Sequence, residues 1–497
     1  MLSKPQRPGF ILFDMAAFLL RQIIPCAYIY VLCFLPNVDA QEWEAPNEFK
    51  SLVYELFPDT LSNQMFIGGK FTSIDGVRTG TIVSYDGQVF HHSMADSSSN
   101  MNYCWNGGCR GVASIISYKG DIIASLVRSS TYDAMPQIIG IGRWDGQTWH
   151  PLDGGIASLY QPTLQYYSPA TAYDFCVADD TLYIAGYLHF VDSLPARGLA
   201  SWDGEKWHIF DVPQPEPGLA VLANSVAKYK GNVYLGGNFI VPVDGEETCD
   251  LIRFDGTSWH KVGSGLIDGL TNLHDLEVFQ DKLYVAGYFA QADGNPGNSI
   301  MSWDGEQWND LGGGVCTPFG AIDDLFVNED KLYIAGYFDC IGGIEAHNVA
   351  SWDGEKWCSI GNSMFNRAIH AVAVWRDTVY VGGSFFEIDG QPAKYFAKYV
   401  GDHAMDTCSA PVSAAPEVQV GKKGLRLWPN PATELLQINA PTPIESVWVY
   451  DAQGREVLRP NVSGDQASVS VAHLPAGLYY VALRAGGKIW GGRFVKE

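Results

Sequence analysis

Six aspartates recur along the sequence at intervals of 59 to 49 residues, and such a row of carboxylates would suit calcium binding or acid–base chemistry. They are Asp86, Asp145, Asp203, Asp255, Asp304 and Asp353. Each is followed by Gly, and Asp-Gly is a preferred connection of a two-residue β-hairpin because both residues tolerate positive φ. The hairpin already accounts for Asp at these positions. We therefore interpret the six aspartates as turn residues.

The ten cysteines are the next candidates for chemistry, and Cys26 and Cys33 fall in an apolar stretch near the N-terminus. The sequence contains no paired CxxC or adjacent His motif of a zinc site, and its histidines are scattered, so we predict neither a metal nor another cofactor. In an exported chain, cysteines favour disulfides. The two expected pairs are Cys104 with Cys109, which bracket a Trp-Asn-Gly-Gly turn, and Cys316 with Cys340, which fall in loops on one face of neighbouring repeats. The cysteines left unassigned are Cys176, Cys249, Cys358 and Cys408.

Aromatic residues in long connecting segments are the candidate ligand-binding groups. They are Trp105, Tyr160, Tyr166 and Tyr167. Long loops on a rigid scaffold commonly carry binding sites, and exposed aromatic rings suit sugars or flat apolar surfaces. The alternative is that these rings pack beneath their own loops. No catalytic set is recognisable, so no catalytic residue is predicted.

The element that must position these residues is a repeat of about 50 residues, best seen at residues 331–357. Tyr333-Ile334-Ala335-Gly336 is a short strand stopped by Gly, residues 348–352 form a second strand, and the Asp-Gly turn leads into a third. The first of these strands recurs at Phe66, Tyr183, Tyr234, Tyr284 and Tyr380, with a degenerate copy at Asp121. This period, with several short strands in each unit, is typical of propeller blades. We predict an all-β protein with a seven-bladed β-propeller over residues 41–404.

The last repeat lacks its fourth strand. Residues 369–375, 378–385 and 395–400 supply three, and the chain then leaves without a Trp-bearing strand. Gln41-Glu42-Trp43-Glu44 resembles the fourth strand of the preceding repeat, Glu355-Lys356-Trp357, and has no repeat of its own. The sequence therefore predicts that the start of the mature chain completes the last blade and leaves no open sheet edge.

Residues 1–40 are predicted to be a signal peptide. Residues 23–35 form an uncharged apolar run behind Arg21, which is too short to span a bilayer, and Val38-Asp39-Ala40 suits cleavage after Ala40. The start is Met1 or Met15. A short membrane anchor is the alternative, but we expect no transmembrane segment after processing.

The chain is acidic, with 55 Asp and Glu against 32 Lys and Arg and a formal net charge of −23. Binding to phosphates depends on clusters of Lys and Arg, so this balance argues against nucleic acid and anionic lipid partners. Solubility outside the cell is the simplest explanation.

A second domain is expected after a linker at residues 405–424, whose small, Pro-bearing composition is typical of linkers. Over residues 425–497, period-two alternation with turn signals favours a small Ig-like β-sandwich. Four blocks occur there in order: PNP at 429–431 followed by LLQI, VWVYDAQGREV at 447–457, LPAGLYYV at 474–481 and GRFVK at 492–496.

These four blocks closely resemble the C-terminal sorting domain of type IX secretion cargo in Bacteroidota. The resemblance implies that the type IX translocon is a partner, and that the protein is secreted or held at the cell surface after passing through the periplasm. It implies that the sorting signal includes Pro429, Asn430, Pro431, Gly477, Tyr479, Gly492, Arg493, Phe494 and Lys496. Whether the domain is removed after export stays open.

The repeats over residues 41–404 resemble secreted kelch-like, cortical-marker (Rax2-like) and delta-60 propeller repeats. Propellers host both binding modules and enzymes, so this resemblance implies a fold rather than an activity. We expect an exported binding or adhesion module for a glycan or a surface protein. The alternative is a glycoside hydrolase or other polysaccharide-active enzyme, which would show a cluster of acids and arginines in the propeller centre.

Overall fold

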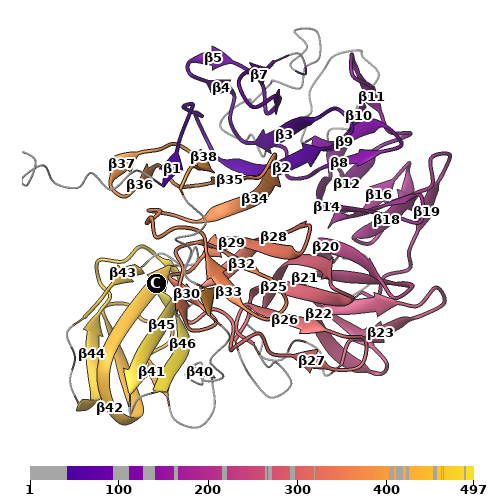
Figure 1. The fold of residues 1–497 in the computed structure, drawn as a ribbon. Helices are drawn as coiled ribbons and strands as arrows, with labels where there is room; N and C mark the ends of the chain where they lie inside the picture. The colour runs from indigo at the N-terminus through magenta and orange to yellow at the C-terminus, as the bar shows by residue number, and fades with distance from the viewer. Residues whose placement is uncertain are drawn as a thin grey trace, which may run out of the picture. The chain divides into compact units, whose positions relative to one another are not determined.

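The computed structural model describes residues 42–92, 94, 111–126, 140–161, 166–214, 221–263, 266, 271–290, 297–317, 320–401, 408–409, 418–420, 425–451, 456–460, 462, 464–485 and 488–496. Every regular element in these ranges is a β-strand, so the predicted all-β class is confirmed (Figure 1). Within these ranges, no helix with the length and apolar character of a membrane span occurs.

Seven small antiparallel sheets follow one another along the first four-fifths of the chain (Figure 1). Sheets I to III contain β2 (Val53–Asp59), β3 (Gln64–Gly69), β6 (Ile82–Tyr85) and β7 (Phe90–His91); β8 (Ile115–Tyr118), β9 (Asp121–Leu126), β10 (Gly140–Trp144) and β11 (Trp149–Pro151); and β14 (Thr171–Ala178), β15 (Thr181–Tyr187), β18 (Leu199–Trp202) and β19 (Trp207–Ile209). Sheets IV and V contain β20 (Leu222–Tyr229), β21 (Asn232–Val243), β22 (Glu246–Phe254) and β23 (Trp259–Lys261); and β24 (Asn272–Phe279), β25 (Lys282–Tyr288), β26 (Ile300–Trp303) and β27 (Trp308–Asn309). Sheets VI and VII contain β28 (Ala321–Asn328), β29 (Lys331–Tyr337), β32 (Val349–Trp352), β33 (Trp357–Ser359) and β39 (Cys408–Ser409); and β34 (Ile369–Trp375), β35 (Thr378–Gly383), β38 (Phe396–Tyr399) and β1 (Trp43–Glu44).

Small two-stranded hairpins lie between the second and third strands of several sheets. They are β4 (Ser73–Ile74) with β5 (Val77–Arg78), β16 (Phe190–Val191) with β17 (Leu194–Pro195), β30 (Cys340–Ile341) with β31 (Ile344–Glu345), and β36 (Glu387–Ile388) with β37 (Gln391–Pro392). A further hairpin, β12 (Ile156–Gln161) with β13 (Tyr166–Pro169), joins sheet II to sheet III and pairs with β16.

The six repeated aspartates are turn residues, as the sequence indicates. At each one, Oδ1 accepts the backbone N–H groups of the second and third residues that follow. In the sheet VI turn these distances are 2.8 Å from Glu355 and 2.7 Å from Lys356 to Asp353. The carboxylate thus closes the hairpin between the third and fourth strands.

The sheets bury their faces against one another. Their first strands contact in chain order, from β2 through β8, β14, β20, β24 and β28 to β34, and β34 contacts β2. A separate hydrophobic cluster lies between each pair of consecutive sheets. A sheet of four short strands cannot bury both faces alone, so stacking in such a circuit supplies the core. The seven-bladed propeller stays our interpretation of this circuit.

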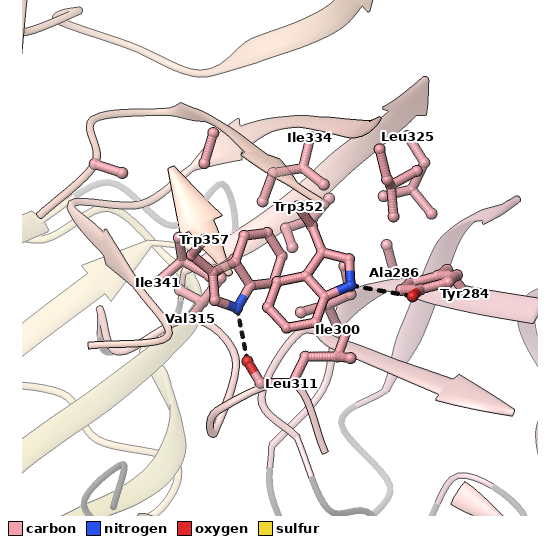
Figure 2. Packing of buried hydrophobic residues seen from close by; sticks show 14 of the residues in the cluster. Tyr284, Ala286, Ile300, Leu311, Val315, Leu325, Ile334, Ile341, Trp352 and Trp357 are labelled. Carbon is pink, nitrogen blue, oxygen red and sulfur yellow. Dashed lines mark hydrogen bonds between the residues drawn. The ribbon is translucent and has the colours of Figure 1, made fainter. Parts of the chain in front are cut away.

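The cluster between sheets V and VI buries two of the repeated Trp residues (Figure 2). Trp352 and Trp357 have ring centroids 4.8 Å apart. Nε1 of Trp352 donates to the Tyr284 hydroxyl at 3.1 Å, and Nε1 of Trp357 donates to the Leu311 carbonyl at 2.7 Å (Figure 2). Both indoles are therefore buried with their one polar atom bonded, which avoids the cost of an unpaired donor.

The predicted closing strand is present. β1 pairs antiparallel with β38, with Trp43 opposite Tyr399 and Glu44 opposite Lys398. Trp43 is fully buried, and its ring centroid lies 5.3 Å from that of Phe365. The prediction that the segment with Trp43 and Glu44 completes the last sheet is therefore confirmed, whereas cleavage after Ala40 stays a prediction.

Two disulfides occur among the described residues. Cys316–Cys340 is one of the pairs expected from the sequence, and Cys358–Cys408 joins two cysteines that the sequence left unassigned. Cys176 and Cys249 are free thiols, and the expected pair Cys104 and Cys109 lies outside the described residues.

Two short strands fall inside segment 405–424, which the sequence indicates as a linker. β39 pairs with β33 next to the Cys358–Cys408 disulfide, which makes it part of sheet VI. β40 (Val418–Val420) pairs in parallel with β46 (Lys488–Lys496) of the C-terminal domain.

The C-terminal domain is built around one long strand, β42 (Leu435–Asp451). Its first part pairs with β41 (Arg426–Trp428) and β44 (Gly464–Ser470), and its second part pairs with β43 (Glu456–Leu458) and β45 (Gly477–Ala485). β46 continues from β45 as the last hairpin. The domain has its own buried cluster, which includes Phe494 and Tyr479.

Candidate functional site

A register shift near the start of the first strand recurs in six of the seven sheets. Such a bulge leaves one residue without a partner in the ladder and re-aims its side chain. The residues skipped by these shifts are Tyr54, Tyr173, Asn224, His274, Asp323 and His370. The repeat therefore places one special side chain per sheet at equivalent positions of the first strands.

These six side chains line one cavity of about 440 Å³, together with Lys70, Ala113 and Thr171. We call this cavity the mouth pocket. All six lie near the beginnings of first strands, on the side where the fourth strand of one sheet connects to the next sheet. Thr171 follows the β12–β13 hairpin by two residues.

Four side chains from four sheets, two of them joined through Asn272, form a continuous polar arc along the mouth pocket. Nδ2 of Asn224 donates to Oδ1 of Asn272 at 3.0 Å, and Nδ2 of Asn272 lies 3.1 Å from Nε2 of His274. Nδ1 of His274 lies 3.0 Å from Oδ1 of Asp323, and Nδ1 of His370 lies 2.7 Å from Oδ2 of the same carboxylate. We call Asn224, His274, Asp323 and His370 the polar arc. One carboxylate therefore holds two imidazoles, one from each neighbouring sheet.

The charges within the arc are coupled. Burial alone would raise the pKa of Asp323, but the hydrogen bonds from His274 and His370 outweigh it and hold the pKa well below its usual range. For His274, burial disfavours the charged form, yet Asp323 favours it more strongly, and the pKa of the imidazole is raised. The two imidazoles thus favour the ionised form of Asp323, and the charge of Asp323 in turn favours the protonated form of His274.

One residue further along the first strands lies a second set of acidic side chains. They are Glu55, Asp174, Asp275 and Asp324, which we call the acid belt, and they line a second cavity of about 400 Å³ together with Glu277. Three of the acids accept a backbone N–H from the first strand of a neighbouring sheet: Asp174 from Val226 at 2.9 Å, Asp275 from Leu325 at 2.8 Å and Asp324 from Val372 at 2.7 Å. Ser225 continues the series by accepting from Leu276 at 3.1 Å. The belt therefore ties neighbouring sheets together.

Burial gives the belt unusual protonation. It raises the pKa of Asp174 to about 7, helped by the charge of Asp275, and it raises the pKa of Glu277 to about 8. The pKa values of Glu55, Asp275 and Asp324 are raised for the same main reason. Burial therefore favours the neutral form of these carboxyl groups, which reduces repulsion among them.

The sequence did not identify the mouth pocket or the acid belt, although a signal exists. An acid followed by Leu or Phe recurs at Glu55-Leu56, Asp174-Phe175, Asp275-Leu276 and Asp324-Leu325, about one repeat or two apart. The four aromatic residues singled out from the sequence occupy other places. Trp105 lies outside the described residues, Tyr160 is on β12, and Tyr166 and Tyr167 are on β13, where Tyr160 pairs with Tyr167. Their role in ligand binding stays a prediction.

No group of three or more His, Cys, Asp or Glu side chains in the described ranges is arranged to hold a metal ion.

The sorting motifs of the C-terminal domain converge on the last strand. Oδ1 of Asn430 accepts the N–H of Val495 at 2.9 Å, and Nδ2 of Asn430 donates to the carbonyl of Arg493 at 3.3 Å. The N–H of Ala432 donates to the carbonyl of Val495 at 2.8 Å. We call these three bonds the tail clasp. Pro429 and Pro431 flank the Asn that makes two of them.

The side chains of the last strand pack against the same blocks. Phe494 is fully buried and stacks on Tyr479 with centroids 5.5 Å apart. Gly477 and Lys496 are opposite one another in the β45–β46 ladder. A Cβ at Gly492 would lie 2.7 Å from Leu427, so this position has no room for a larger residue without movement. Three of the four motifs, PNP, LPAGLYYV and GRFVK, thus form one packed unit.

Comparison with known proteins agrees with this unit. The family described as the secretion system C-terminal sorting domain matches residues 426–497. No curated protein matches the chain.

The solved structures that match the chain share little sequence with it. The extracellular domain of a putative hybrid two-component system from B. thetaiotaomicron shares 11% identity with this chain, with a TM-score of 0.43. The match covers 90% of this chain and 56% of that domain. A computationally designed protein, Ika8, shares 12% identity with a TM-score of 0.34, covering 90% of this chain and 97% of its own. PorZ, a surface component of the type IX secretion system of Porphyromonas gingivalis, shares 12% identity with a TM-score of 0.18, covering 90% and 82%. The match of residues 426–497 to the sorting domain indicates that this chain interacts with the secretion system and is secreted or attached to the cell surface.

Proposed function

We propose that this exported protein is a binding or adhesion module for saccharides, delivered by the type IX secretion system, and that the mouth pocket is its ligand site. Trp105, Tyr160, Tyr166 and Tyr167 are proposed to make further contacts with the ligand.

The observation that carries the proposal is a set of polar groups in the pocket without protein partners. Among the described residues, no group bonds the hydroxyls of Tyr54 and Tyr173, the ammonium of Lys70 or Nε2 of His370. The polar arc behind them is bonded internally, so its geometry is fixed before a ligand arrives. A cavity with fixed polar groups and aromatic rings suits a ligand that presents several hydroxyls and an apolar ring face.

Glycoside hydrolysis is the alternative, and the acid belt is the observation that favours it. Hydrolysis needs two carboxyl groups that flank the scissile bond, one as acid and one as base or nucleophile. Asp174, Asp275 and Asp324 instead use their oxygens to accept backbone N–H groups of the next sheet. No arginine lines either cavity in the described part of the chain. Binding is therefore the better supported function.

A glycan array followed by calorimetry on the purified mature protein tests the proposal. Tyr173→Ala is expected to weaken saccharide binding by about tenfold or more, which corresponds to about 1.4 kcal/mol, with the melting temperature nearly unchanged. His370→Ala is expected to weaken binding by a similar factor but also to lower the melting temperature, because it removes a hydrogen bond from the buried carboxylate of Asp323. Leu61→Ala is the matched control. Leu61 is 76% exposed and lies in the turn after β2, whereas the pocket residue Tyr54 lies at the beginning of that strand. Absence of saccharide binding by the unaltered protein, or unchanged binding in both pocket variants, would contradict it. Release of reducing sugar would support hydrolysis instead.

A further inference from the structure

We infer that the mouth pocket binds an acidic saccharide and that Lys70 pairs with the carboxylate or sulfate of that ligand. This inference rests on the proposed function and specifies the chemical class of the ligand.

The first argument is the balance of charge in the pocket. Asp323 is the one carboxylate that lines the described pocket, and its two oxygens are already engaged by Nδ1 of His274 at 3.0 Å and Nδ1 of His370 at 2.7 Å. Lys70 forms no ion pair with any described residue. An ammonium that lines a cavity and has no counter-ion among the described residues favours an anionic ligand, because pairing recovers the cost of partial desolvation.

This balance is unusual for the chain, whose formal net charge is −23. Acidic chains repel acidic polymers at long range, so a local positive site must do the recognition at contact distance. Among the described residues that line the pocket, Lys70 brings the one ammonium and Asp323 the one carboxylate, and that carboxylate is already bonded by two imidazoles. An acidic sugar bound in this pocket could therefore pair with the ammonium of Lys70.

The position of Lys70 is set by rigid backbone. Its N–H donates to the carbonyl of Leu52 at 2.8 Å, just after β3. The preceding Gly69 approaches the same carbonyl so closely that a Cβ there would lie 2.3 Å from it. The ammonium is thus presented from a fixed point beside Tyr54, which belongs to the same sheet.

The acid belt is the feature that opposes the inference. Glu55, Asp174, Asp275 and Asp324 each follow a residue that lines the pocket. Three of them direct an oxygen to a backbone N–H of the next sheet, and burial favours their neutral form. Repulsion between the acid belt and an acidic ligand is therefore weakened. The repulsion that remains favours a position of the acidic group beside Lys70. The neutral hydroxyls then face the polar arc.

Calorimetry on the mature protein tests this inference with oligosaccharides of equal length that contain uronate, carry sulfate or are neutral. The acidic ligands are expected to bind about tenfold tighter than the neutral one at low salt, and this advantage is expected to shrink at about 0.5 M sodium chloride because screening weakens the ion pair. Lys70→Met is expected to remove the advantage, whereas Lys70→Arg is expected to keep most of it. Lys356→Met is the matched control, because Lys356 is exposed on an Asp-Gly turn.

The outcomes separate the inference from the proposed function. Preference for uronate over sulfate, or the reverse, supports the inference and identifies the acidic group. Equal binding of neutral and acidic ligands that is still lost in Tyr173→Ala overturns the inference and leaves the function standing. Acid preference that survives Lys70→Met overturns the role of Lys70. Absence of binding to all three ligands overturns both.

Discussion

Aspartate serves two opposite purposes in this protein, and the surroundings of each side chain decide which. At the turns, Asp86 and Asp304 accept two backbone N–H groups while exposed to solvent, and these bonds lower the pKa of each to about 2. In the belt, burial raises the pKa of Asp174 to about 7. The turn aspartates stabilise the protein when they are ionised. The buried carboxyl group of Asp174 is accommodated because burial favours its neutral form.

The stability of the folded protein should therefore depend on pH in two windows. The turn aspartates contribute stability above their unfolded pKa of about 3.9, and this contribution is lost as the pH falls toward 2. Asp174 and Glu277 have raised folded pKa values of about 7 and about 8, so their contribution is full below about pH 4 and is lost as the pH rises to 8. We expect the melting temperature to be highest near pH 4 to 5 and to fall toward pH 8.

Thermal melts from pH 3 to pH 9 would measure this dependence. Glu277→Gln is expected to flatten the fall between pH 5 and 8, because the amide cannot ionise, whereas Glu355→Gln, an exposed turn substitution, is expected to leave the profile unchanged. A melting temperature that rises steadily from pH 5 to 8 would contradict the assignment of raised pKa values.

The turn residues were predictable from the sequence, but the site residues were not. An Asp before Gly determines its own surroundings, because the backbone groups that it binds are two and three residues away. His274, Asp323 and His370 meet only because three first strands lie side by side and each carries a bulge. Nothing local in the sequence specifies that bulge.

At the scale of strands, the sequence predicts the strands that follow a local pattern but not every pairing between distant strands. The four strands of each sheet follow from alternating burial and turn chemistry, and the closing role of residues 42–44 follows from counting strands. The pairing of β39 with β33 could not be inferred, because a two-residue strand carries too little pattern. Its position became visible only through the Cys358–Cys408 disulfide.

The closing strand gives the prediction at this scale. Deletion of residues 42–45 from the mature protein exposes the edge of β38 and removes Trp43, a fully buried side chain. Loss of a buried Trp typically costs about 3–5 kcal/mol, so we expect a fall in melting temperature of several degrees and increased self-association through the open edge. Differential scanning calorimetry and light scattering would measure both effects.

A milder substitution separates packing from strand pairing. Trp43→Phe keeps the backbone pairs with Tyr399 and Lys398 and fills part of the space against Phe365. It is expected to lower the melting temperature less than the deletion and to leave the protein monodisperse. If the deletion melts like the unaltered protein, β1 does not close the last sheet in solution.

At the scale of the whole chain, the proposed binding site and the sorting domain lie in parts of the protein with separate cores. The sheets pack through seven inter-sheet clusters, and the C-terminal domain packs through a cluster of its own. Damage to one core should therefore leave the other folded. A variant of the last strand should block delivery without changing ligand affinity.

Phe494→Ala is the sharpest such variant. The side chain is fully buried against Tyr479, and its removal is expected to destabilise the C-terminal domain by about 3–5 kcal/mol. Asn430→Ala removes two bonds of the tail clasp and should release the same strand while leaving the cluster intact. Both variants are expected to accumulate inside the outer membrane, as measured by fractionation and immunoblotting, because the presented strand no longer has its recognised shape.

Val495→Thr is the matched control, since Val495 lies on the same strand but is 40% exposed, and its clasp bonds involve only the backbone. This variant should be exported normally. Material recovered from the two blocked variants should still bind saccharide with unaltered affinity, because the mouth pocket draws no residue from beyond sheet VII. Normal export of Phe494→Ala would mean that the packed last strand is not what the secretion system recognises, and the signal would then have to lie elsewhere in residues 426–497.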